Sequence, residues 1–455
     1  MNPLRAQFDA VDGCMPFGVV GQVQAVAGMT IEAAALALPL GSLCKIHSLG
    51  GKTSSAEVIG FRHDRTLLMP LSSTNGVARG DRIENVASAP RIWCSDQLLG
   101  RVLDGYGQPM DGKRALSLSE SRRIDGRGVV PLQRQNIRQP ISTGVRAIDG
   151  LHTCGLGQRM GIFSGPGVGK STLMSWIAKH TSADISVIAL IGERGREVQE
   201  FLEHSLGPSG LGRTVVIVST SDDPPLLRVR AAKVACTVAE YFRDRGKHVL
   251  LMMDSLTRLA QAQRQIGLAA HEPPATKGFP PSVFALLPEI LERAGKTATG
   301  SITGFYTVLV EGDDFNEPIP DAVKGITDGH LWLSRALANR RHFPAIDILQ
   351  SISRVRSDVT DAAHQAAASD ITRLTAIYQD IEDLVSIGAY ARGSNLKNDM
   401  ALEARDRILN YLQQSPTDPS TLEVARQQVI DLANWLKQVQ QALEAAARSK
   451  QAKGK

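Results

Sequence analysis

The segment from Ile162 to Thr172 contains the residues of this chain best suited to chemistry. An apolar run ends at Ser164 and is followed by Gly165, Pro166, Gly167, Val168, Gly169, Lys170, Ser171 and Thr172. The glycines let the backbone curl so that successive N–H groups converge on phosphate oxygens, and a helix expected over 171–180 adds the positive end of its dipole. Lys170 is then placed to neutralise the β- and γ-phosphates and the Ser171 hydroxyl to bind Mg²⁺. The segment predicts a P-loop for a nucleoside triphosphate, with Ser164 in place of the pattern's first glycine; a glycine-rich hairpin turn is the alternative.

A carboxylate follows a second apolar run. Residues 249–253 are apolar and lead to Asp254, as in a buried parallel strand that delivers an acid to a metal at its carboxyl end. Such runs are common in α/β proteins, so the run alone leaves the role of Asp254 open. Its combination with the P-loop favours a ligand of Mg²⁺.

A third apolar run, residues 185–191, precedes the charged stretch 192–197. Glu193 lies just beyond the expected strand end, where a carboxylate can hold and polarise the water that attacks the γ-phosphate. A solvated loop, in which Glu193 and Glu197 pair with neighbouring arginines, explains the same residues equally well.

The elements that must position these residues fall into three regions. From Gly18 to about Val86, short β-rich runs alternate with turn residues, which indicates a small barrel or sandwich. From about Ser95 to Ser357, strands alternate with helices such as 225–245, which indicates a mostly parallel sheet covered on both faces. The ligand of such a sheet binds at the carboxyl ends of its strands. The expected strands of the sheet are 160–164, 185–191, 215–219, 248–253, 302–310 and 330–333.

From about Asp358 the chain is rich in alanine and favours helices, at 362–383 and 399–414. A last helix is expected to begin with a capping box of Ser420 and Glu423. Its apolar residues recur at spacings of three and four, which fits a coiled-coil seam to a neighbour or partner as well as packing on its own domain. They are Leu422, Ala425, Val429, Leu432, Leu436, Val439, Leu443 and Ala446.

Several motifs together resemble the catalytic-head subunits of rotary ATP synthases, over about 17–412. They are Gly100–Gly112, Thr143–Asp149, Gly192–Glu197, Met253–Arg258 and Pro344–Arg354. Within that superfamily, Glu272–Phe284 resembles the type III protein-export ATPases and departs from the synthase subunits. Asp383–Ser394 resembles the flagellar branch more than the injectisome branch.

The resemblance implies an α/β protein that hydrolyses ATP to drive protein export. It implies an N-terminal β-barrel domain with a short extension (1–92), a central RecA-like P-loop domain with a mostly parallel sheet (93–357) and a C-terminal helical domain (358–455). Residue by residue, it implies that Lys170 binds phosphate, that Ser171 and Asp254 hold Mg²⁺, that Glu193 is the catalytic carboxylate and that Arg194 is a supporting cation. Arg354 matches an arginine finger inserted into the neighbouring subunit's site. Phe343 matches a ring placed against adenine, although an ordinary core phenylalanine also explains it.

A finger supplied to a neighbour makes each site complete only at an interface, so the active species must be an oligomer. The resemblance implies a homohexamer. It also implies regulatory and stalk proteins, a membrane export gate, export chaperones and flagellar substrates as partners.

Composition limits the alternatives. The 455 residues are 43% hydrophobic and 21% charged, as in soluble globular proteins of several domains. A net charge of +5 is a mild excess that gives no support for nucleic-acid binding. The five cysteines lie far apart, and neither a signal peptide nor a membrane span is evident, so we expect a cytoplasmic protein at the inner face of the membrane only through partners.

Other functions stay open at the level of sequence. An injectisome ATPase, a rotary synthase catalytic subunit and a nucleotide-holding subunit that never turns over all fit a P-loop, and a ring that moves RNA is a weaker candidate. Glu193 argues against the passive subunit, which could lose that carboxylate without penalty.

Overall fold

The β-rich runs near the N-terminus form a closed barrel of six antiparallel strands in the computed structural model. Alternate residues point inward, and the interior contains buried Val23, Ile46 and Ile83. The structure therefore confirms the barrel that the resemblance implied and excludes the sandwich. Its strands are β1 (Val20–Ala27), β2 (Thr30–Ala34), β3 (Leu43–His47), β4 (Thr53–Arg62), β5 (Arg65–Pro70) and β6 (Arg82–Ala87).

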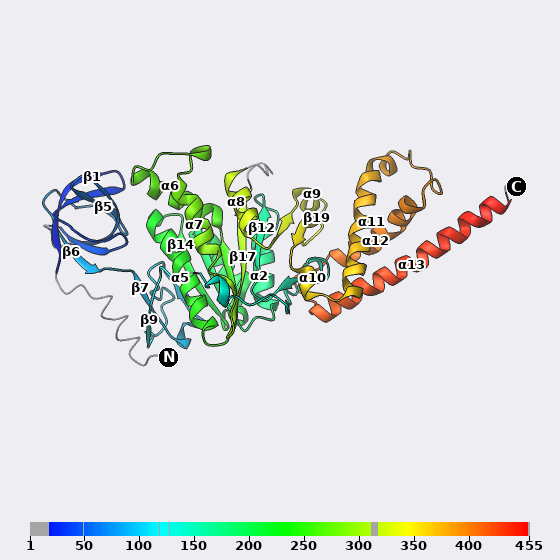
Figure 1. The fold of residues 1–455 in the computed structure, drawn as a ribbon, viewed down its shortest axis with the longest axis horizontal. Helices are drawn as coiled ribbons and strands as arrows, with labels where there is room; N and C mark the ends of the chain where they lie inside the picture. Colours follow the sequence, from blue (N-terminus) through cyan, green and yellow to red (C-terminus); the bar gives the residue numbers. More distant parts are fainter. Residues whose placement is uncertain (1–17, 49, 118, 127, 311–316, 454–455) are drawn as a thin grey trace.

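The structure describes residues 18–48, 50–117, 119–126, 128–310 and 317–453, so the N-terminal extension expected before the barrel lies outside the described residues. The barrel occupies one end of the molecule, the sheet domain its middle and the C-terminal helices the other end (Figure 1). In this described part, none of the helices combines the length and apolar character of a membrane span.

The central sheet has the strand order β19-β18-β12-β17-β15-β13-β14-β8, with β16 paired to β17. Only β19 and β16 run antiparallel to their neighbours, which confirms the mostly parallel sheet. The strands are β8 (Val102–Leu103), β12 (Arg159–Ser164), β13 (Ile185–Glu193), β14 (Thr214–Thr220), β15 (His248–Asp254), β16 (Gly295–Lys296), β17 (Ser301–Leu309), β18 (Gly329–Leu333) and β19 (Ile346–Ser353).

Helices cover both faces of the sheet because its buried strands are apolar on both sides. On β13, Val187 and Ala189 belong to the core formed with α5, α6 and α7, whereas Ile188 and Leu190 belong to the core formed with α2. These helices are α2 (Lys170–His180), α5 (Pro225–Arg243), α6 (Leu256–Ala269) and α7 (Pro281–Leu291).

Short elements connect these layers. They are β7 (Arg91–Cys94), β9 (Glu120–Arg123), β10 (Pro140–Ile141), β11 (Cys154–Gly155), α3 (Gly195–Glu200), α4 (Gly207–Leu211), α8 (Pro318–Ile326), α9 (Arg335–Asn339) and α10 (Arg356–Val359). Strand β7 pairs with β9 and leads the chain from the barrel into the central domain. The four described cysteines are buried free thiols.

The C-terminal part consists of α11 (Ala362–Ser386), α12 (Leu396–Leu412) and α13 (Leu422–Lys453). Val429, Leu432 and Leu436 of α13 are buried in the core that α11 and α12 share, so packing on its own domain explains this part of the apolar stripe. Figure 1 shows α13 continuing beyond both helices to the end of the molecule. The cap differs from the predicted capping box by one residue, since the Thr421 hydroxyl accepts from the Val424 N–H at 3.3 Å.

Candidate functional site

The glycine-rich segment forms the tight turn between β12 and α2. Gly167 and Gly169 have φ of +76° and +93°, a region in which residues with a Cβ are strained. Ser164 is the last residue of β12 and lies in extended backbone. A glycine is therefore not required at Ser164, which explains the departure from the P-loop pattern. Helix α2 begins at Lys170, one residue before the expected start.

Lys170 lies between two carboxylates that come from neighbouring parallel strands. Its Nζ is 2.6 Å from Asp254 Oδ1 and 3.8 Å from Glu193 Oε1. Burial disfavours the charged amine, but the attraction of Asp254 and then Glu193 outweighs it and raises the pKa of Lys170. The structure thus brings together three of the residues singled out from the sequence, at the edge where the parallel strands end.

Glu193 ends β13 and faces into this cluster, with only 17% of its side chain exposed. Burial, followed by the charge of Asp254 and a hydrogen bond with Glu197, raises the pKa of Glu193 to about 7. The solvated-loop reading holds for its neighbours instead: Arg194 is 82% exposed and pairs with Glu197 at 3.8 Å. The structure therefore does not bring Arg194 together with Lys170.

Asp254 ends β15 and is almost completely buried. Its Oδ1 atom accepts a second short hydrogen bond, at 2.7 Å, from Oγ1 of the fully buried Thr307. We did not single out Thr307 from the sequence, because it lies within an apolar strand. The one available signal was a hydroxyl in the middle of a strand expected to be buried on both faces.

The remaining oxygen donors fit Mg²⁺. Ser171 lies exposed in the first turn of α2, next to Lys170. Asp254 Oδ2 accepts no hydrogen bond from any residue that the structure describes. A hydroxyl and a carboxylate oxygen are ligands that this hard cation prefers, and its other positions are commonly filled by phosphate and water.

Phe343 lies beside the P-loop. A Cβ added at Gly169 would be 3.6 Å from Phe343 Cε1, and 39% of Phe343 is exposed. An open ring at this place is a stacking surface for a base bound next to the phosphates. Its exposure argues against an ordinary core phenylalanine.

Arg354 lies at the opposite edge of the sheet from the P-loop. It follows β19, and its N–H donates to Asp328 O at 2.9 Å, just before the first residue of β18. The P-loop instead follows the last residue of β12, which pairs with the last residue of β18. At about 3.3 Å per residue, roughly 13 Å of β18 separates the two edges. The exposed Arg354 side chain therefore lies away from the P-loop of its own chain.

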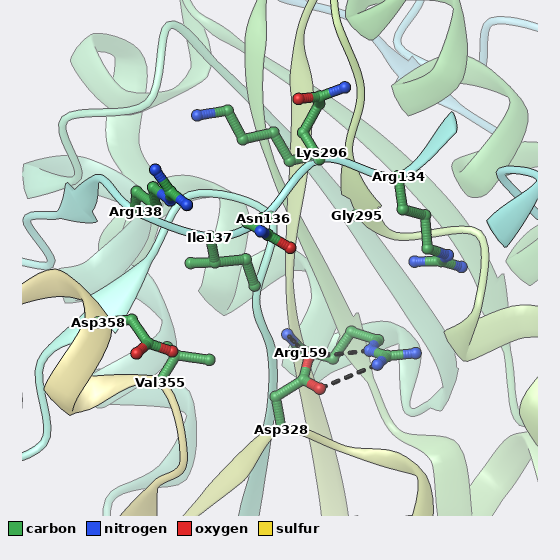
Figure 2. Close-up of a pocket in the computed structure, with 12 residues that line it drawn as sticks. Arg134, Asn136, Ile137, Arg138, Arg159, Gly295, Lys296, Asp328, Val355 and Asp358 are labelled. Atoms are coloured by element: carbon green, nitrogen blue, oxygen red, sulfur yellow. Dashed lines mark hydrogen bonds and ion pairs between the residues drawn. The ribbon is translucent and has the colours of Figure 1, made fainter. Parts of the chain in front are cut away.

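A cleft of about 770 Å³ is lined by Arg159, Asp328 and Val355 among others (Figure 2). It opens at the same edge as Arg354, whose N–H donates to Asp328 O. It carries four basic side chains, but two of them are neutralised: Arg159 pairs with Asp328, and Arg134 pairs with Glu292. This cleft is distinct from the phosphate site, because Arg159 is the first residue of β12 and the P-loop follows the last. The basic side chains are Arg134, Arg138, Arg159 and Lys296.

Comparison with known proteins agrees with this geometry. Residues 144–353 match the nucleotide-binding domain of the ATP synthase alpha/beta family, and residues 360–431 match the C-terminal domain of the type III secretion ATPase EscN. The flagellum-specific ATP synthase of Bacillus subtilis is 50% identical over 424 residues, which cover 92% of this chain and 96% of that protein.

This chain belongs to the ATP synthase alpha/beta family. Two solved structures place it among the type III export ATPases of that family. The assembled ATPase EscN of enteropathogenic E. coli superposes with a TM-score of 0.86 at 46% identity, covering 91% of this chain and 100% of that one. EscN in complex with its central stalk EscO gives a TM-score of 0.84 at 45% identity, with the same coverage. The expected barrel, sheet and helical architecture is therefore confirmed for this member of the family.

Proposed function

We propose that this export ATPase hydrolyses ATP in a homohexameric ring to energise protein export by the flagellar type III apparatus. The observation that carries the proposal is the cluster of Lys170, Glu193 and Asp254 beside a P-loop. A chain that only held a nucleotide would need neither a buried carboxylate with a raised pKa nor its placement beside the phosphate-binding lysine.

Each residue of the cluster has a distinct part in phosphoryl transfer. The N–H groups of the segment from Gly165 to Thr172 cradle the phosphates, and Lys170 neutralises them. Glu193, once ionised, accepts a hydrogen bond from the attacking water and aligns it with the γ-phosphate. Phe343 holds the adenine ring. Bound Mg²⁺ supplies charge stabilisation at the phosphate oxygens, and Ser171 and Asp254 are the residues that hold it.

Arg354 acts on the neighbouring subunit's nucleotide. Its exposed position at the edge opposite its own P-loop supports this role, because a head-to-tail ring brings opposite edges of successive subunits together. Arg194 is exposed and paired with Glu197, and we propose that it supports the phosphate site only in the assembled ring. A guanidinium at the γ-phosphate accelerates transfer by about a thousandfold or more.

The partners follow from the export role. We propose that a stalk protein binds the ring, as EscO does for EscN, and that regulatory proteins, a membrane export gate, chaperones and flagellar subunits complete the system. The protein then works in the cytoplasm, at the inner face of the membrane, and binds no nucleic acid.

Deletion of the gene in its own bacterium, with complementation by wild type or Lys170→Ala, tests the proposal. We expect loss of filaments and swimming, restored by wild type alone. An injectisome role is the second candidate, since EscN is itself a secretion ATPase; loss of effector secretion with intact swimming would favour it. Normal swimming and normal secretion in the deletion strain would refute both.

A further inference from the structure

Thr307 occupies the strand between the two that form the phosphate site. Strand β17 lies between β12, which leads into the P-loop, and β15, which ends in Asp254. Thr307 pairs with Ile162 of β12 and follows Tyr306, the partner of Met253. This register places the Thr307 hydroxyl next to the carboxylate of Asp254.

The hydroxyl proton of Thr307 has one short acceptor. Oγ1 is 2.7 Å from Asp254 Oδ1 and 3.3 Å from Met253 O, so the carboxylate is the better-placed partner. Both side chains are buried, Thr307 completely, and a hydrogen bond from a neutral donor to a buried carboxylate stabilises its charged form.

Lys170 is the other donor to the same oxygen, at 2.6 Å. A bound triphosphate competes for this ammonium group, because the phosphate oxygens carry more negative charge than one carboxylate. The Thr307 hydroxyl is neutral and completely buried, and its hydrogen bonds go to Asp254 Oδ1 and Met253 O, so a bound triphosphate does not attract it as it attracts an ammonium group. It therefore remains on Oδ1 when Lys170 turns to the phosphates.

We infer that Thr307 is a positioning residue that holds Asp254 by one oxygen so that the other faces the metal of the Mg·nucleotide complex. The inference rests on the proposed Mg²⁺ site. A carboxylate fixed at Oδ1 presents Oδ2, which accepts no hydrogen bond from the described residues, in one orientation. Without the hydroxyl the carboxylate can rotate, and Mg²⁺ has to select one of several orientations.

The test measures ADP affinity of the full-length protein by calorimetry, once with Mg²⁺ and once with EDTA. Mg²⁺ should increase the ADP affinity of Thr307→Val about tenfold less than it increases that of wild type, in line with a lost hydrogen bond to a charged group. Its affinity in EDTA should stay within about twofold of wild type, since the phosphate and base contacts are unchanged. The Mg²⁺ concentration for half-maximal turnover should rise in parallel.

Thr307→Ser is the matched variant, because it keeps the hydroxyl and loses only a methyl group. It should recover most of the Mg²⁺-dependent gain. If the valine variant does not fold, Thr307→Cys, with a weak donor of similar size, should give a loss between those of serine and valine.

The outcomes separate the two hypotheses. If the ADP affinity of the wild-type protein is the same with Mg²⁺ and with EDTA, the proposed metal site is refuted. Two outcomes would refute the positioning role of Thr307 without refuting the metal site. One is a Thr307→Val protein whose ADP affinity increases with Mg²⁺ as much as that of wild type, and the other is a loss of ADP affinity that is as large in EDTA as in Mg²⁺.

Discussion

Several neighbouring groups shift the pKa of Glu193 in opposite directions, and in the proposed mechanism its protonation state determines whether it can align the attacking water. Burial and the nearby charge of Asp254 raise its pKa to about 7, while Lys170 acts in the other direction. A protonated carboxyl has lost the negative charge that makes it a strong acceptor, so it cannot polarise the attacking water or take its proton. The proposed mechanism therefore requires the ionised form of Glu193, which predominates above about pH 7.

We predict that kcat/KM for ATP rises with pH through a midpoint near 7, because this parameter reports the ionisation of the free enzyme. Steady-state phosphate release between pH 5.5 and 9 measures it. Glu193→Gln should reduce turnover by a factor on the order of 100 or more and remove the rising limb.

Glu197→Gln is the control for the cause of that midpoint. Glu197 raises the pKa of Glu193 through a hydrogen bond and through its charge, so its replacement should move the midpoint to lower pH with little change in the plateau. A midpoint that does not move, or that persists in Glu193→Gln, would assign the ionisation to another group.

At the scale of elements, the strands around the site were predictable because they are long, apolar and bounded by the motifs themselves. The predicted strand 248–253 and the observed β15 differ by one residue at the end. The bounds of the barrel strands β2 and β6 are harder to predict, since their sequences TIEAA and RIENVA are short and rich in alanine or charge. Their conformation depends on pairing with barrel neighbours rather than on local preference.

Some residues of the candidate site could be predicted from the sequence and others could not. Glu193 and Asp254 are the last residues of their strands and Lys170 follows the turn after β12, so their positions in the sequence determine their positions in space. The contacts of Thr307, and the exposure that separates Arg194 from Glu193, depend on side-chain packing that the motifs do not encode.

Both expected domain limits, after 92 and after 357, fall inside the short elements β7 and α10, and we propose that these two elements are the joints between the three domains.

Arg293, in the turn between α7 and β16, links α5 to the residue that follows β9. It is 1% exposed, and its guanidinium donates to both carboxylate oxygens of Glu240 on α5 at 2.7 Å. It also donates to Ile124 O at 2.8 Å and to the Thr237 hydroxyl at 2.9 Å. Removal of this side chain leaves the Glu240 carboxylate without its charged partner.

We predict that Arg293→Ala lowers the free energy of unfolding of the central domain by about 3–5 kcal/mol, the usual cost of breaking a buried ion pair. Calorimetric unfolding measures it. Arg293→Met combined with Glu240→Leu should recover much of the loss, because neither charge remains. Arg392→Ala breaks an exposed pair with Glu403 and should cost less than about 1 kcal/mol. Equal losses in the buried and the exposed variants would contradict the argument.

At the scale of the whole molecule, the residues of the proposed catalytic site lie at opposite edges of one sheet. Lys170 and Glu193 follow parallel strands at one edge, and Arg354 follows the antiparallel strand β19 at the other. A single chain therefore presents the P-loop at one edge and, at the other, the exposed Arg354, whose Nη2 donates to Lys324 O at 3.5 Å. In the proposed ring of identical chains, Arg354 of each chain completes the site of its neighbour. Two variants, one with a defective P-loop and one without the Arg354 guanidinium, test this arrangement.

We predict that Lys170→Ala and Arg354→Ala are each inactive as pure rings and that a mixture of the two regains turnover. In a mixed ring, the intact P-loop of an Arg354→Ala subunit meets the intact finger of a Lys170→Ala neighbour. Random mixing at equal amounts places this pair at about a quarter of the interfaces, so activity should approach a quarter of wild type if the sites act independently. Phosphate release from co-assembled rings, with hexamer formation checked by light scattering, measures it. As a control, a double variant carrying both changes on one chain should restore no activity when mixed with either single variant. If the two single variants assemble together and the mixture stays inactive, the proposal of a site shared between neighbouring chains is wrong.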